Sequence, residues 1–137
     1  MRYSEAFARL GYQLSSPRQD WTAEKEDGIC ITIWQSQMSW KAGQPWLDTR
    51  AHGGPIERWG GAAGNRKRIE HIERAIGEFD GNVDVVVVRG KPGEGVDDAF
   101  PWLPERRKGY RWKITAFEPR TGHFRAETFL PSNREAG

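Results

Sequence analysis

The chain has 137 residues, with 36% hydrophobic and 29% charged residues and a formal net charge of +2. This length suits one domain with one real core, and we expect residues 1–137 to form a single domain. The longest apolar run, Val85–Val88, is too short to cross a bilayer, so we expect no membrane partner.

The N-terminus and the cysteine content indicate a compartment. The first residues, MRYSEAFARLGY, lack the apolar stretch of a signal peptide. The single cysteine, Cys30, cannot form an internal disulfide. We therefore expect a cytoplasmic protein, in a host cytoplasm if the source is viral.

The first half of the chain contains a short helix and a hairpin. Residues 4–10 predict the helix. Trp21–Glu24 and Ile29–Gln35 predict two strands joined at Asp27-Gly28, a strong turn dipeptide. Both faces of the second strand are apolar, which favours a central position in a sheet. Residues 36–63 are irregular, with strand fragments near 37–41 and 45–49.

The main helix is predicted over residues 65–79. Asn65 is suited to the N-cap position, because its side-chain oxygen can accept from free backbone N–H groups. Ile69, Ile72, Ile76 and Phe79 recur at steps of three and four, which predicts one buried helical face.

The second half predicts three strands. Val83–Arg89 is the clearest strand, and Tyr110–Phe117 and His123–Phe129 form a closing hairpin. Residues 90–109 read as a long loop, and the tail from about 131 as frayed. The fold class is α+β: a mixed curled sheet or open barrel of about five or more strands, with the main helix and a short N-terminal helix.

The start of the main helix carries an electrostatic anomaly. Arg66, Lys67 and Arg68 follow the expected cap, although a helix N-terminus already has a partial positive charge. An anion bound there would resolve the repulsion, and nearby glycines would let it approach the backbone. The alternative is a solvated basic turn.

Basic and aromatic residues together suggest a nucleic-acid partner, with DNA favoured over RNA. Phosphates pair with cations and bases stack on aromatic rings. We expect the long segments 40–63 and 90–109 to flank one cleft. Expected nucleic-acid contacts are Asn65, Arg66, Lys67, Arg68, Arg106, Arg107, Lys108 and Arg111, and expected stacking residues are Trp40, Trp59 and Trp102. Alternatively, the tryptophans cover the core and the cations solvate it.

Other chemistries have less support. No metal-ligand motif, cofactor motif or nucleophile elbow occurs, so we expect no metal site, no cofactor and no catalytic residue, and favour a binding domain over an enzyme. One alternative is an Mg²⁺-dependent nuclease using Asp20, Glu24, Asp97 or Asp98. Another is a protein-interaction module of a phage or defence system, anchored by the loop tryptophans.

Three short motifs between residues 50 and 112 resemble a known family. They are Gly64–Arg68, Val86–Gly90 and Gly109–Trp112. Their order is similar to that of SRA domains, base-flipping readers of modified cytosine in the PUA-like group. Trp112-Lys113 departs from that family's acidic-glycine step. The resemblance implies a PUA-like barrel that reads a modified or flipped base, and it assigns no pocket residue.

Overall fold

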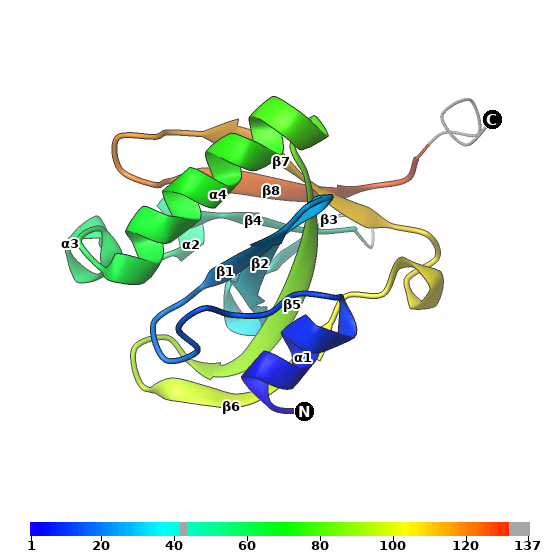
Figure 1. Cartoon of the computed structure of the whole chain (residues 1–137). Helices are drawn as coiled ribbons and strands as arrows, with labels where there is room; N and C mark the ends of the chain where they lie inside the picture. Colours follow the sequence, from blue (N-terminus) through cyan, green and yellow to red (C-terminus); the bar gives the residue numbers. More distant parts are fainter. Residues whose placement is uncertain (42–43, 132–137) are drawn as a thin grey trace.

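A ten-residue strand, β5, joins the two halves of this molecule (Figure 1). The computed structural model describes residues 1–41 and 44–131. The frayed tail expected from about 131 lies almost wholly outside the described residues. The elements are α1 (Tyr3–Arg9), β1 (Thr22–Lys25), β2 (Gly28–Trp34), the 3-10 turn η1 (Gln35–Gln37), β3 (Ser39–Lys41), β4 (Gln44–Asp48), α2 (Thr49–His52), α3 (Ile56–Trp59), α4 (Ala63–Phe79), β5 (Asn82–Lys91), β6 (Gly95–Pro101), the 3-10 turn η2 (Pro104–Arg106), β7 (Arg111–Phe117) and β8 (Phe124–Phe129).

The described strands form one mixed sheet that does not close into a barrel. Their order is β1-β2-β5-β7-β8-β4-β3, and β6 pairs with β5 beside this path. Among the strands that the structure describes, only β2 and β5 pair in parallel. The first residues of β5 pair with β7, while the rest of the strand pairs with β2 and β6. The predicted α+β class, with one main helix and a short N-terminal helix, is confirmed.

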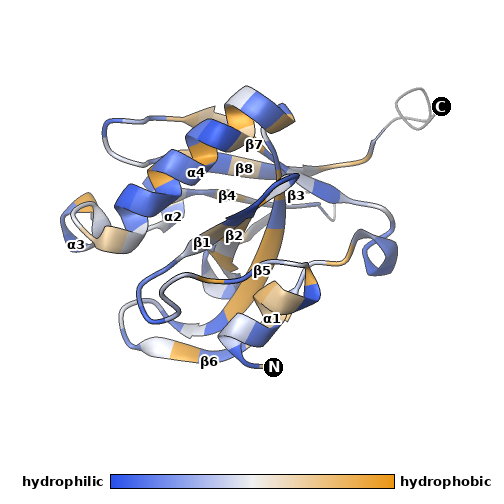
Figure 2. Ribbon diagram, in the orientation of Figure 1, coloured by the Kyte–Doolittle hydropathy of each residue, from blue (hydrophilic) through white to orange (hydrophobic). Residues whose placement is uncertain are grey.

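The valine run of β5 is buried on both faces, because each face supports a separate core. Val83, Val85 and Val87 face the larger core, which also contains the isoleucines of β2. Val86 and Val88 face the smaller core, with Cys30 and the buried side of α1. β5 is among the most hydrophobic ribbons in Figure 2. The expected central position of the Ile29–Gln35 strand is confirmed, since β2 lies between β1 and β5.

Helix α4 covers the larger core, but in a different rotation from the predicted one. Ile72 is fully buried, whereas Ile76 is 46% exposed. The predicted inclusion of Ile76 in the buried face is therefore wrong. Polar residues, among them Arg68 and His71, occupy part of the buried face instead. Hydrophobic spacing missed this, because it assigns buried positions to apolar residues only.

The predicted N-cap is also wrong. Helix α4 begins at Ala63, two residues before the expected start, and its N-cap is Ala62 without a side-chain cap hydrogen bond. Asn65 lies inside the first turn and is fully buried. Its side chain bonds to other segments of the chain, so it does not serve the helix terminus.

The segment 90–109 was predicted to be a long loop. This prediction is wrong in part, because the segment contains strand β6. The antiparallel pair of β5 and β6 includes a bulge between Arg89 and Gly90. Gly90 has a φ of 135° and lies so close to Gly95 that a side chain would not fit there. The amino group of Met1 donates to the Ala99 carbonyl of β6, and the Ala99 N–H donates back to the Met1 carbonyl.

None of the helices in the described part of the chain is long and apolar enough to span a membrane.

Two isoleucines on α4 test this helix rotation. Ile72→Ala should lower the free energy of unfolding by about 2–4 kcal/mol, because it leaves a cavity in a packed core. Ile76→Ala is the matched control and should change it by less than about 0.5 kcal/mol, since the side chain is half exposed. Urea unfolding at neutral pH measures both. Equal losses would show that the helix is rotated toward the predicted face.

Candidate functional site

The three cations at the start of α4 point to three different partners. Arg66 donates to the carbonyl of Gly61 at 2.8 Å, on the surface. Lys67 pairs with the buried carboxylate of Asp20 at 3.0 Å. Arg68 turns into the protein. The structure therefore does not bring these side chains together around one anion.

Arg68 is a buried cation held by aromatic rings. Its guanidinium carbon lies 4.7 Å from the ring centre of Trp21, 4.9 Å from Phe124 and 5.3 Å from Trp59. Among the described residues no carboxylate pairs with it and its Nε has no hydrogen-bond partner. Burial lowers the pKa of the guanidinium. The three rings offset part of this cost through cation–π attraction.

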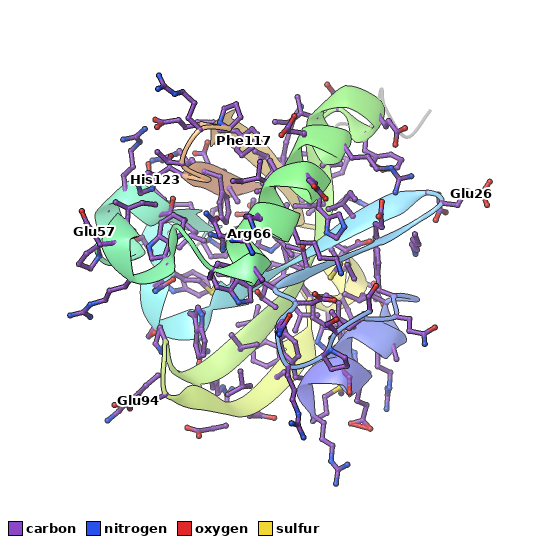
Figure 3. All side chains as sticks on the ribbon, turned by 60° about the vertical axis from the view of Figure 1, so that its left-hand side comes forward. Glu26, Glu57, Arg66, Glu94, Phe117 and His123 are labelled. Atoms are coloured by element: carbon purple, nitrogen blue, oxygen red, sulfur yellow. The ribbon has the colours of Figure 1, made fainter. Side chains whose placement is uncertain are left out.

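Asn65 joins the first turn of α4 to two loops. Its amide nitrogen donates to the carbonyls of Gly60 at 2.9 Å and Thr121 at 3.0 Å. Its oxygen accepts from Arg68 at 3.3 Å. A side chain at Gly122 would overlap Asn65, so this glycine permits close packing between protein segments. In Figure 3 Arg66 marks this start of α4, with His123 on the neighbouring β7–β8 connection.

The rest of the polar face of α4 packs on β1 through matched pairs. His71 Nδ1 lies 2.6 Å from the hydroxyl oxygen of Thr22. Burial lowers the pKa of the His71 imidazole despite the nearby carboxylate of Glu24. Burial alone would raise the pKa of Asp20. The Ser16 N–H and Lys67 outweigh that effect and lower it below its usual value. These polar groups thus attach the helix to the strand.

The three expected stacking tryptophans lie in different environments. Trp40 on β3 is 61% exposed. Trp59 on α3 is half-buried, with its ring edge-to-face on His123 and near Arg68. Trp102 is only 5% exposed, because Arg107 covers its ring at 4.6 Å and its N–H donates to Tyr110. Only Trp40 therefore offers a freely exposed ring.

An open cleft of about 870 Å³ lies at the other end of α4, where β7 diverges from β5. The β1–β2 turn, the end of α4 and the start of β7 contribute lining residues, and Figure 1 shows these three segments near one another. The cleft combines buried apolar residues with half-buried aromatic rings and charged groups. Its lining residues are Asp27, Gly28, Ile29, Phe79, Asp80, Asn82, Val83, Asp84, Val85, Trp102, Pro104, Arg111, Trp112, Lys113, Phe129 and Pro131.

The cleft contains an aromatic pair of which the sequence assigned only Trp102 to a site. Trp102 and Trp112 meet edge-to-face at 5.5 Å, and Trp112 is 1% exposed. Trp112 alternates with polar residues on its strand, which predicts a core position. Nothing in that pattern shows that β5 and β7 part beside it, so the sequence carried no signal that Trp112 belongs to this cleft.

One lip of the cleft is basic. Arg111 and Lys113 line it, and the predicted basic cluster Arg106–Lys108 follows Pro104, another lining residue. Arg106, Lys108 and Arg111 are exposed. Of the second half of the predicted nucleic-acid contacts, Arg111 lines the cleft, and Arg106–Lys108 lie on the chain segment between the lining residues Pro104 and Arg111. The 17-residue helix α4, about 25 Å long, separates this lip from Arg66–Arg68.

The other lip is acidic, and it adjoins the basic lip where Lys113 meets Asp80 at 3.3 Å. Asp27 lies in the β1–β2 turn, and Asp80 is the C-cap of α4 with a φ of 55°. Their carboxylate side chains are 85% and 89% exposed. The carbonyl end of α4 adds partial negative charge to this lip.

The expected partnership of the two long segments is not seen at this cleft. Trp102 and Pro104 come from residues 90–109, but no described residue between 40 and 63 lines the cleft. Trp40 and Trp59 lie outside it as well.

The carboxylates of the nuclease alternative are occupied by cations in three cases. Asp20 pairs with Lys67, Glu24 with Arg74, and Asp98 with the N-terminal amino group at 2.5 Å. Asp97 is exposed on β6. Among the described residues, no three His, Cys, Asp or Glu side chains gather in a way that could hold a metal ion.

A nucleophilic site finds little support in the side chains present. Ser39 Oγ lies 3.0 Å from His52 Nε2, but the buried Nδ1 of His52 has no partner in the described residues. A serine–histidine pair needs an acceptor at that nitrogen to orient the ring. Burial raises the pKa of the Cys30 thiol, which keeps it protonated and unreactive.

Comparison of the chain with protein-family models, with curated proteins and with solved structures finds no match.

Substitutions of Arg68 test whether this buried cation is structural. Arg68→Met should leave the free energy of unfolding within about 1 kcal/mol of the wild type, because an apolar side chain of similar length removes a buried charge that its contacts compensate only in part. Arg68→Ala should lower it by about 2–4 kcal/mol, since the aromatic rings then surround a cavity. Urea unfolding distinguishes them. A large loss in Arg68→Met would mean that the guanidinium contacts are worth more than its desolvation costs.

Proposed function

We propose that this domain binds nucleic acid and accepts one unstacked base in the cleft between β5 and β7. The observation that carries the proposal is the combination of an aromatic cleft with a basic lip. Bases favour aromatic and apolar surroundings, and phosphates favour exposed Arg and Lys side chains. The volume of about 870 Å³ lies within the range of small-ligand sites.

The aromatic contacts in this proposal differ from those predicted. The buried rings of Trp102 and Trp112 support the cleft from below, and the half-buried rings of Phe79 and Phe129 offer edges and faces to a base. Arg106, Lys108, Arg111 and Lys113 then contact the phosphates on either side of that base. Arg107 serves mainly to cover Trp102.

The finer parts of the proposal concern the kind of nucleic acid. The resemblance to SRA domains favours DNA over RNA and a modified base in the cleft. Of its three motifs, Gly109–Trp112 supplies Arg111 and Trp112 to the cleft lining. The motif Gly64–Arg68 lies at the far end of α4. The single buried thiol, Cys30, is consistent with a cytoplasmic location.

A second candidate function is protein binding through the edge strand β3. Trp40 is its supporting observation, because an exposed tryptophan on a short edge strand is a typical interface anchor. Trp40→Ala would abolish such binding and leave the cleft unchanged. Nucleic-acid binding that survives Trp40→Ala separates the two functions.

A triple substitution in the basic lip tests the main proposal. Arg106→Gln, Lys108→Gln and Arg111→Gln together should weaken binding of a fluorescent oligonucleotide at least about tenfold, and the slope of log K against log[salt] should shrink by roughly 0.7 for each lost phosphate contact. Fluorescence anisotropy over a salt series measures both.

The matched control removes three exposed arginines from the other end of the molecule. Arg58→Gln, Arg66→Gln and Arg120→Gln change the net charge equally, and all three positions are exposed. This variant should keep most of the affinity and salt slope. If it loses as much as the lip variant, the binding surface is at the start of α4 or is non-specific, and the cleft proposal is wrong.

A further inference from the structure

The two lips of the cleft carry opposite charge, and this contrast extends beyond the lining residues. The basic lip contains five cations and one carboxylate: Glu105, Arg106, Arg107, Lys108, Arg111 and Lys113. The acidic lip contains five carboxylates and two cations: Glu24, Lys25, Glu26, Asp27, Arg74, Glu78 and Asp80.

The acidic lip keeps most of its charge. Lys25 approaches Asp27 only to 3.9 Å, and Lys113 reaches Asp80 at 3.3 Å in a pair exposed to solvent. Exposed pairs of this kind are weak and are screened by salt. Arg74, the other cation of this lip, already pairs with both Glu24 and Glu78. A negative potential therefore faces any polyanion that spans the cleft.

We infer that the cleft selects single-stranded over double-stranded nucleic acid, with the basic lip holding one backbone and the acidic lip repelling a second. This inference rests on the proposed function. A base in the cleft brings its own strand to the mouth. In a duplex the complementary backbone follows at a groove's width, about 6–12 Å, which is close to the Debye length at physiological salt.

The cost of unpairing acts in the same direction. A base in a single strand enters a pocket without breaking a base pair, whereas a duplex base must first leave its partner and its stack. The acidic lip adds a repulsion that depends on salt and on two identifiable carboxylates. Its contribution can therefore be separated from the cost of unpairing.

The test uses the double variant Asp27→Asn and Asp80→Asn. Both changes preserve the local backbone, because Asn-Gly also forms tight hairpin turns and Asn tolerates the left-handed conformation at a helix C-cap. The matched control is Glu57→Gln with Glu94→Gln, which removes the same charge from exposed positions. Figure 3 labels both of these glutamates well away from Glu26 of the acidic lip.

The measurement is the Kd of each protein for a single strand of roughly 12 nucleotides and for the duplex of the same sequence, at low and physiological salt. We expect the wild type to prefer the single strand at least about tenfold, and the double variant to reduce this ratio at least about threefold by gaining duplex affinity. The control should keep the wild-type ratio.

Each failure has a distinct meaning. Absence of binding to both probes would overturn the proposed function and this inference together. Single-strand binding with the same ratio in wild type and double variant would overturn the role of the acidic lip alone. A wild type that prefers the duplex would overturn the inference and leave nucleic-acid binding intact.

Discussion

Burial of β5 on both faces is the constraint on which the rest of this structure depends. A strand can bury both faces only if each is covered, so the chain needs one layer on each side. Helix α4 and the curled β7–β8–β4 part of the sheet cover one face, and α1 covers the other. Because β5 also pairs with β2, β6 and β7, it determines where the sheet divides and hence where the cleft opens.

Helix α4 combines two roles through its two ends. Its first turn buries Asn65 and Arg68, which join the helix to the α3 region and to the β7–β8 connection. Its last turn places Asp80 at the acidic lip of the cleft. Buried polar groups of this kind need specific partners, so they specify how the helix is seated more narrowly than apolar contacts would.

The charge division of the cleft gives the proposed function a direction. Cations on one lip attract phosphates, and carboxylates on the other limit how a polyanion can approach. Such a cleft contributes more to selectivity than to affinity, because its carboxylates penalise the disfavoured ligand while its cations stabilise the favoured one.

The sequence by itself determined the parts that depend on local periodicity. The Asp27-Gly28 hairpin, the main helix, the valine strand and the closing hairpin all followed from spacing and turn chemistry. It also identified the Arg106–Lys108 and Arg111 cations near the cleft.

Tertiary structure decided the rest. Arg66, Lys67 and Arg68 are adjacent in the chain, but on a helix they point about 100° apart, so three neighbours met three different partners. Trp112 and Asp27 are far apart in the chain and share one cleft only because β5 and β7 part beside them. Such long-range contacts depend on how the whole sheet packs, and no local pattern records that.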